Sequence, residues 1–172
     1  MPGKPRGNQS SRAGAGLSLR GAAMQEDFNI VIKPIGQVRN DVNLPLKEGW
    51  EKVVSELILD DKLEEATEGL EQFSHIIVVF WMHKVPQEGG IPTKVHPRGR
   101  QDLPLVGLLA TRAPYRPNPI GVSVVRLLER RRNVLKVKGL DAINGTPLID
   151  IKPYLPGNGV DDAWFPQWVN RL

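Results

Sequence analysis

The run "FSHIIVVFWMH", from Phe73 to His83, constrains the fold of this chain more than any other stretch. Its β-branched residues disfavour a helix, and it is far shorter than the roughly 20 residues that a membrane-spanning helix needs. A continuous apolar run of this kind is typical of a strand that is buried on both faces. The sequence therefore predicts a water-soluble domain built around this strand.

Most of the remaining chain also favours strands, because β-branched and apolar segments alternate with turn residues. The other expected strands are 28–38, 50–59, 105–111, 120–128, 134–140 and the segment "LIDIKPYLP" from Leu148. Helix-forming residues at 62–70 predict one short helix, residues 84–103 predict a long loop, and "DAINGTP" (141–147) predicts a turn with Gly145 suited to positive φ. Six or seven strands with one helix predict a mostly β fold, a small closed or nearly closed β-barrel.

Charge is distributed unevenly along the chain. Residues 1–25 are rich in Gly, Ser, Pro and Arg and carry the whole net charge of +4. They predict a disordered basic tail, followed by one domain over 26–172. Within the domain, residues 41–71 hold ten acidic and three basic side chains, whereas 84–138 hold twelve basic and three acidic ones. Either the basic region meets a polyanion, or the two signs mix on solvated faces after folding.

Several classes of site are excluded or disfavoured by composition. The chain has no cysteine, so disulfides, thiolate catalysis and cysteine-ligated zinc are excluded, which fits a reducing compartment. With three histidines, His75, His83 and His96, no metal site is expected. The absence of G-x-G-x-x-G and G-x-x-x-x-G-K-[ST] patterns argues against a Rossmann domain and a P-loop.

The segment "ATRAPYRPNPIGVS" (110–123) is unsuited both to a helix and to an inner strand. Each of its prolines removes a backbone donor and pushes the preceding residue toward extended conformations. Arg112 and Arg116 lie on this stiff strip, and the guanidinium fork suits carboxylate or phosphate. The segment is therefore either a preorganised binding edge or a surface loop with solvated arginines.

Four segments together resemble a known family. "IGQVRN", "FSHIIVVFWMH", "GLLATRAPYRPNPIGVSVVRL" and "LDAINGTPLIDIKPYLP" occur in the order seen in the TsaA-like / TrmO family, over most of 30–156. The resemblance implies a β-barrel that forms a homodimer and binds S-adenosylmethionine without a Rossmann fold. It further implies a cytoplasmic enzyme that methylates N6 of threonylcarbamoyladenosine at position 37 of tRNA, beside the anticodon.

Carried over by motif, the resemblance also implies a set of site residues. The expected cofactor contacts are His83, Lys84, Arg112, Val122, Asn144, Gly145, Thr146 and Pro147. Tyr115 is suited to stacking on a splayed anticodon base and Arg116 to the threonyl carboxylate, so both are expected substrate contacts. No catalytic residue is identified, and the basic region 84–138 is expected to meet tRNA phosphates.

Two positions depart from the family pattern. Family members commonly carry a "PRQ" segment between the first two strands, where this chain reads "RNDVNLPLKEGW", and Asn144 replaces the usual aspartate before "GTP". These departures keep two alternatives open: a methyltransferase acting on another base or small molecule, and a non-enzymatic RNA-binding barrel.

Overall fold

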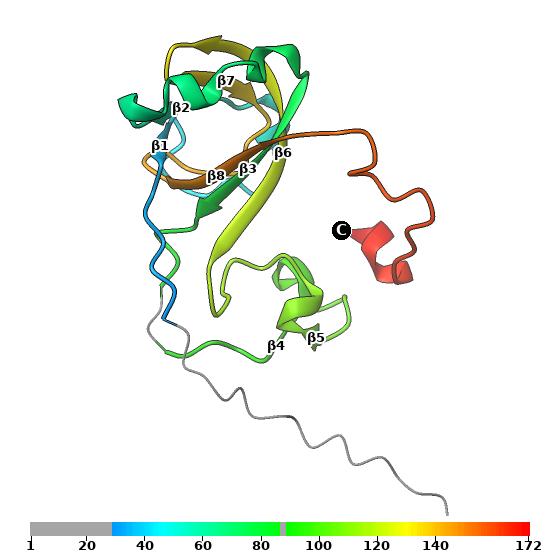
Figure 1. Cartoon of the computed structure of the whole chain (residues 1–172). Coiled ribbons are helices and arrows are strands. Elements are labelled where there is room, and N and C mark those ends of the chain that lie inside the picture. Colours follow the sequence, from blue (N-terminus) through cyan, green and yellow to red (C-terminus); the bar gives the residue numbers. More distant parts are fainter. Residues whose placement is uncertain (1–28, 87–88) are drawn as a thin grey trace, which may run out of the picture. The chain divides into compact units, whose positions relative to one another are not determined.

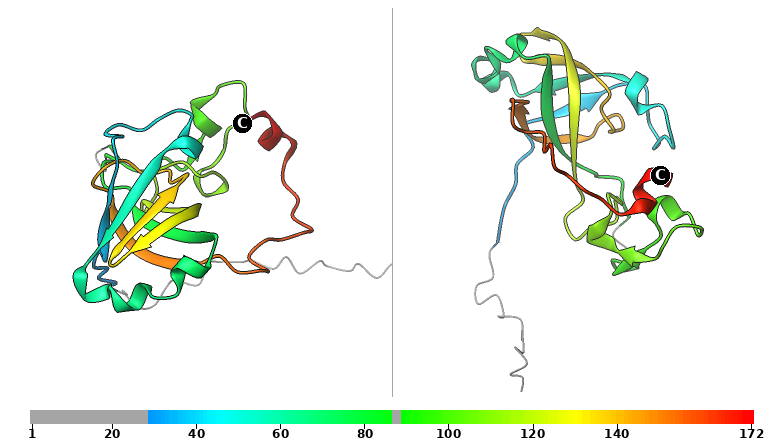
Figure 2. Two further views of the ribbon diagram at one scale, coloured as in Figure 1. Left: turned by 90° about the horizontal axis from the view of Figure 1, so that it is seen from above. Right: turned by 90° about the vertical axis from the view of Figure 1, so that its right-hand side faces the viewer.

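Six antiparallel strands close into a barrel in the computed structural model, which describes residues 29–86 and 89–172 (Figures 1 and 2). Residues 32–172 form one compact unit. The barrel order is β1 (Gly36–Arg39), β2 (Val54–Leu59), β7 (Val134–Lys138), β6 (Ile120–Arg131), β3 (His75–Trp81) and β8 (Pro147–Pro153). The predicted mostly β barrel is confirmed. The predicted disordered tail, 1–25, lies outside the described residues.

The barrel interior is filled by alternate side chains of the strands, as the period of two in a β-strand requires. The buried cluster consists of Val38, Leu57, Leu59, Ile76, Val78, Phe80, Val125, Leu127, Leu135, Val137, Leu140, Ala142 and Leu148. Burial of this many branched apolar side chains supplies the main driving force for closure of the barrel.

Strand β3 lies between β6 and β8, and it has the most apolar sequence of the barrel. Ile76, Val78 and Phe80 are buried, whereas the alternate residues are partly exposed. The prediction of burial on both faces was therefore wrong. An antiparallel barrel covers one face of its wall completely, and the outer face keeps access to solvent.

Three predicted strands were wrong in extent. The one at 50–59 starts only at Val54, because Trp50–Lys52 form a 3₁₀ turn. The one at 28–38 begins at Gly36 rather than at 28: Ile30 and Val31 are both 77% exposed, and none of the described strands pairs with them. The segment 105–111 forms only the two-residue β5 (Val106–Gly107), which pairs with β4 (Lys94–Val95) within the predicted loop 84–103. These segments have strand-like composition, but no described neighbouring strand pairs with them over their full length.

The remaining regular segments are short 3₁₀ turns. They are η1 (Trp50–Lys52), η2 (Asp61–Leu63), η3 (Glu65–Thr67), η4 (Leu70–Gln72), η5 (Pro97–Gly99), η6 (Leu108–Ala110) and η7 (Gln167–Arg171). The predicted helix at 62–70 is thus present as successive turns, with Gly69 at φ +87 before the last of them. Among the described residues, no helix has the length and apolarity to cross a membrane.

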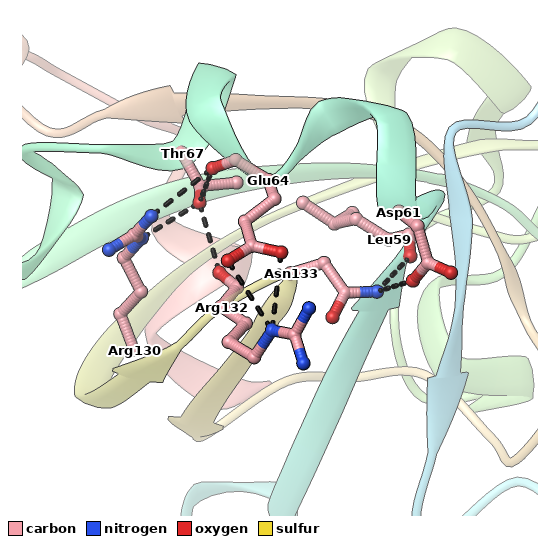
Figure 3. Close-up of polar contacts among 7 residues, drawn as sticks. All are labelled: Leu59, Asp61, Glu64, Thr67, Arg130, Arg132 and Asn133. Atoms are coloured by element: carbon pink, nitrogen blue, oxygen red, sulfur yellow. Dashed lines mark hydrogen bonds and ion pairs between the residues drawn. The ribbon is translucent and has the colours of Figure 1, made fainter.

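A network around Thr67 closes one end of the barrel (Figure 3). The Thr67 side chain is buried, and Arg130 Nε donates to its Oγ1 at 2.8 Å. Arg130 Nη2 also donates to the Glu64 carbonyl at 3.2 Å, and Arg132 Nε lies 3.3 Å from the Glu64 carboxylate. Arg130 of β6 and Arg132 just after it are therefore bound to the acidic segment that holds the turns η2 to η4.

This network also shows which of the basic side chains of 84–138 pair with carboxylates. Arg130 pairs with Glu71 at 3.9 Å and Arg131 pairs with Glu129 at 2.5 Å, so part of the basic region is balanced by carboxylates. The basic residues of 84–138 therefore do not form one continuous basic face. Other members of the region lie at the opposite end of the barrel, around a cavity.

Candidate functional site

A cavity of about 870 Å³ lies at the barrel end away from the Thr67 network. Its wall combines the end of β3, the start of β6 with the proline segment before it, the turn before β8, and the loop between β1 and β2. All of these segments follow or precede strands at the same end of the barrel. The fold thus gathers these four segments from distant parts of the sequence, and Arg98, between β4 and β5, adds a fifth.

The proline segment forms one wall, and it is held by hydrogen bonds to backbone carbonyls. Met82 N–H donates to the Pro119 carbonyl at 2.8 Å, which fixes the segment to the end of β3. Arg116 Nη1 donates to the carbonyls of Thr111 at 2.8 Å and Ala113 at 3.4 Å. The Arg116 guanidinium lines the cavity but also braces its own loop. Tyr115 lines the same wall and is 49% exposed.

Arg112 and Val122 are brought together, as the family motif implies. Arg112 Nη2 donates to the Val122 carbonyl at 2.6 Å, and both residues line the cavity. The cavity also contains Asp141, the one carboxylate among the described lining residues. Burial raises the pKa of Asp141, and the positive charge of Arg112 partly opposes this shift. The cavity therefore contains a guanidinium and a carboxylate that influence each other.

The turn before β8 contributes less surface than the motif implies. Of its four expected contacts, Thr146 lines the cavity, whereas Asn144, Gly145 and Pro147 do not. Asn144 N–H donates to the Val42 carbonyl at 2.7 Å, and Gly145 N–H donates to the Val38 carbonyl at 2.8 Å.

The position before "GTP" also fixes the neighbouring loop. Asn144 Oδ1 accepts the Asn40 N–H at 3.2 Å, and Gly145 has the expected positive φ, +76. The turn thus holds the loop that follows β1 in place. An amide at position 144 retains the acceptor that this contact needs.

His83 and Lys84 follow β3 directly and line the cavity. Burial, followed by the positive charge of Lys84, lowers the pKa of His83 below its ordinary 6.5. The imidazole is therefore neutral at neutral pH and adds no charge to the site. Lys84 Nζ lies 3.5 Å from the Asn43 carbonyl, a distance too long for a strong bond.

The loop between β1 and β2 supplies a wall that sequence reasoning missed. Leu44, Pro45, Leu46, Lys47 and Trp50 all line the cavity, where no counterpart of "PRQ" exists. Trp50 Nε1 donates to the Leu46 carbonyl at 3.1 Å, which closes the loop on itself. This wall is mainly apolar. The signal in the sequence was an apolar Leu-Pro-Leu group (44–46) a few residues after a strand, in a segment without strand periodicity.

Two charged lining residues, Arg98 and Asp141, were also not among the expected contacts. Arg98 lies in the predicted loop 84–103 and Asp141 in the predicted turn 141–147, and the resemblance assigns a contact to neither position. Among residues 29–86 and 89–172, no group of three His, Cys, Asp or Glu side chains could hold a metal ion.

Several known proteins are similar to this chain. It is 40% identical over 132 residues to a probable S-adenosyl-L-methionine-binding protein of Methanothermobacter thermautotrophicus, covering 74% of this chain and 92% of that protein. It is 44% identical over 96 residues to the tRNA (adenine(37)-N6)-methyltransferase of Escherichia coli K12, covering 54% and 40% respectively.

The solved structures agree with the sequence comparison. A crystal structure of TrmO from Pseudomonas aeruginosa superposes with a TM-score of 0.67 at 32% identity, and the match covers 83% of this chain. The matched region is 63% of that structure, so this chain spans less than two thirds of it. The model of the tRNA-methyltransferase O N-terminal domain matches residues 37–160, and the chain therefore belongs to this family.

Proposed function

We propose that this chain is an S-adenosylmethionine-dependent methyltransferase that methylates N6 of threonylcarbamoyladenosine at position 37 of tRNA. The observation that carries the proposal is the cavity with Arg112 and Asp141 in its wall. The amino-acid part of S-adenosylmethionine has a carboxylate and an ammonium group, and this pair of side chains supplies the opposite charge for each. The names of the relatives in M. thermautotrophicus and E. coli support the same cofactor and reaction.

The residues present fit the cofactor in size and chemistry. The cavity volume of about 870 Å³ lies in the upper part of the range of about 300–1,000 Å³ for ligand sites. Leu46, Trp50 and Ile143 provide apolar surface for an adenine ring, and Thr146 provides a hydroxyl from the turn before β8. A second planar group, the acceptor base, has Tyr115 as a stacking surface on the proline segment.

When bound, S-adenosylmethionine supplies a methyl group activated on its sulfonium. Transfer forms a bond from the methyl carbon to N6, breaks the carbon–sulfur bond and releases one proton from N6. The tasks of this chain are then to orient the two reactants and to exclude water. Neutral His83 leaves a cationic sulfonium without a repelling neighbour at that position. The rigid proline segment holds Arg112 in place before the ligands arrive.

The charge of the cavity supports a nucleic-acid substrate. Five basic side chains, Lys47, Lys84, Arg98, Arg112 and Arg116, line it, against the single described carboxylate. Such a concentration of positive charge attracts phosphates, and binding of this kind weakens with salt.

Two measurements test the function together. Titration calorimetry with S-adenosylmethionine is expected to show binding, and nucleoside analysis is expected to show N6-methylated threonylcarbamoyladenosine after incubation with tRNA that carries the modification. Cofactor binding without transfer to this tRNA would favour another base or a small molecule as the acceptor. RNA binding without cofactor binding would favour a non-enzymatic barrel.

The pH dependence of cofactor binding is expected to depend on His83. Because its pKa is lowered from 6.5, the neutral form is retained at neutral pH and is lost as the pH falls through the lowered value. Protonation then adds a cation to a cavity that must hold a sulfonium. Between about pH 7.5 and about pH 5, the dissociation constant is expected to rise by about threefold to tenfold. Calorimetry over this range measures it.

A His83→Gln variant is the matched control for this effect. Glutamine cannot titrate, so its pH profile is expected to be flatter, with only the contribution of Asp141 left. Identical profiles for the variant and the parent chain would contradict the assignment to His83.

The proposal includes a homodimer in the cytoplasm, where mature tRNA is found. Val122, Val124 and Leu128 project from the outer face of β6 and are 46%, 52% and 43% exposed. Partly exposed Ile77 and Val79 of β3 lie opposite Val124 and Val122 in the strand pairing. An apolar strip of this kind favours association with a second chain. Light scattering that gives the monomer mass at all concentrations would contradict it.

A further inference from the structure

The turn between β4 and β5 carries Arg98 and is held firmly by its neighbours. His96 Nδ1 lies 2.8 Å from the Leu103 carbonyl, and Gly99 N–H donates to the His96 carbonyl at 2.9 Å. Pro97 and Leu103 are buried, so they anchor both sides of the turn. The backbone position of Arg98 is therefore fixed by contacts that do not involve its own side chain.

Arg98 adopts a conformation that is unusual for a residue with a side chain. Its φ is +53 and its ψ is +20, in the left-handed region that favours glycine. Among the described residues, one other non-glycine residue, Arg132, has a positive φ, and its guanidinium pairs with Glu64. Strained positions of this kind concentrate at ligand-binding sites.

The Arg98 side chain differs from its neighbours in its contacts. Arg112 and Arg116 donate to backbone carbonyls, and Arg100, two residues away, pairs with Asp102 at 2.7 Å. Within 29–86 and 89–172, no hydrogen bond or ion pair involves the Arg98 guanidinium, although it lines the cavity. A guanidinium fork without a protein partner in a cavity is suited to an oxyanion of a ligand.

We propose that Arg98 binds an oxyanion of the acceptor nucleotide in this cavity. The inference rests on the proposed function. It assigns to Arg98 the role expected from sequence for Arg116, whose guanidinium already binds the Thr111 carbonyl. Arg112 remains the partner of the cofactor. The oxyanion is either the carboxylate of the N6 substituent or a phosphate next to the base, and the two sources share the same fork geometry.

The test is the kinetics of methyl transfer to an anticodon stem-loop RNA that carries threonylcarbamoyladenosine, at saturating S-adenosylmethionine. Arg98→Ala is expected to raise KM for the RNA by about 10- to 100-fold, because a charge-assisted contact is lost. The dissociation constant of the cofactor, measured by calorimetry, is expected to change less than about twofold. Arg98→Lys is expected to recover part of the loss, since it keeps the charge without the fork.

Two further variants separate a binding role from a structural one. Arg98→Gly relieves the left-handed backbone, so its melting temperature is expected to equal or exceed that of the parent chain while KM for the RNA rises as in Arg98→Ala. Lys94→Ala removes a positive charge from β4, the strand before this turn, at a position outside the cavity lining, and it is expected to keep KM near the parent value. If Arg98→Gly has the KM of the parent chain, or if Lys94→Ala loses as much as Arg98→Ala, the proposal is wrong.

A neutral methyl ester of the same RNA distinguishes the two sources of the oxyanion. If the carboxylate is bound, the ester raises KM for the parent chain and abolishes the difference between parent and Arg98→Ala. If a phosphate is bound, the same fold-difference persists with both RNAs. A parent chain that binds cofactor but transfers no methyl group overturns the proposed function itself. Active transfer that is equal in parent and Arg98→Ala overturns the role of Arg98 alone.

Discussion

The Arg112→Ala variant is expected to bind S-adenosylmethionine about 100-fold more weakly than the parent chain. Arg112 lines the cavity, is positioned by its bond to the Val122 carbonyl, and is the expected partner of the cofactor carboxylate. Arg112→Lys is expected to lose about tenfold, because an ammonium group cannot form the paired contacts of a guanidinium. Titration calorimetry measures both affinities.

The matched control for Arg112 is Lys136→Ala. Lys136 is exposed on β7 and does not line the cavity, so the variant removes one positive charge without changing the cavity. Its affinity for the cofactor is expected to stay within about twofold of the parent value. If Arg112→Ala and Lys136→Ala bind equally well, Arg112 does not contact the cofactor.

The Asp141→Asn variant removes the negative charge of the pair formed by Arg112 and Asp141. A raised carboxyl pKa means that the fold loses stability as the pH rises from the ordinary 3.8 through the raised value. At neutral pH the asparagine variant is therefore expected to be at least as stable as the parent chain. Its affinity for the cofactor is nevertheless expected to fall, since the charge opposite the ammonium group is lost. Thermal melting measures the stability and calorimetry measures the affinity for the cofactor, so together they show whether the first is kept while the second falls.

Exchange of Gly36 for alanine is expected to lower the free energy of unfolding by about 3 kcal/mol. Gly36 pairs with Leu59 of β2 and Leu148 of β8, so it lies at a closing seam of the barrel. A Cβ at this position would lie 2.2 Å from the Ile58 carbonyl oxygen and 2.8 Å from the Leu59 Cα. Both are backbone atoms that cannot rotate away, so the strands must separate. Urea denaturation followed by circular dichroism measures the loss.

Gly107→Ala is the control for Gly36→Ala. Gly107 lies in β5, its φ is negative, and no atom lies within 4 Å of a Cβ built there. The substitution is expected to change the free energy of unfolding by less than about 0.5 kcal/mol. If both substitutions lowered the free energy of unfolding equally, the clash with the Ile58 carbonyl could not be the cause of the loss.

The strands that pair along most of their length could be predicted from sequence. The segments 120–128 and 134–140 became β6 and β7, because their inward side chains, such as Val125 and Leu135, are buried against the barrel core. The segment around Ile30 has equally strong β-branched composition but no partner strand, and this is a property of the tertiary structure. Composition records the preference of a segment, and pairing decides whether that preference is realised.

The candidate site was predictable where a motif was continuous in sequence. Arg112, Val122 and Thr146 lie in long motifs and line the cavity. Asn144 lies in one of the same motifs, but its side chain is turned toward the loop after β1, where its Oδ1 accepts the Asn40 N–H. The contribution of Arg98 depends on how the β4–β5 turn meets the barrel end, which no local pattern reveals.

The loop between β1 and β2 is fastened to the protein near its two ends. Asn40 Nδ2 donates to Ser55 Oγ and to the Ala142 carbonyl, both at 2.9 Å, and Trp50 closes the other end. The intervening residues 44–47 therefore line the cavity from a loop that is held at both ends. Exchange of this short peptide is consequently a route to change which acceptor the cavity takes while the barrel stays folded.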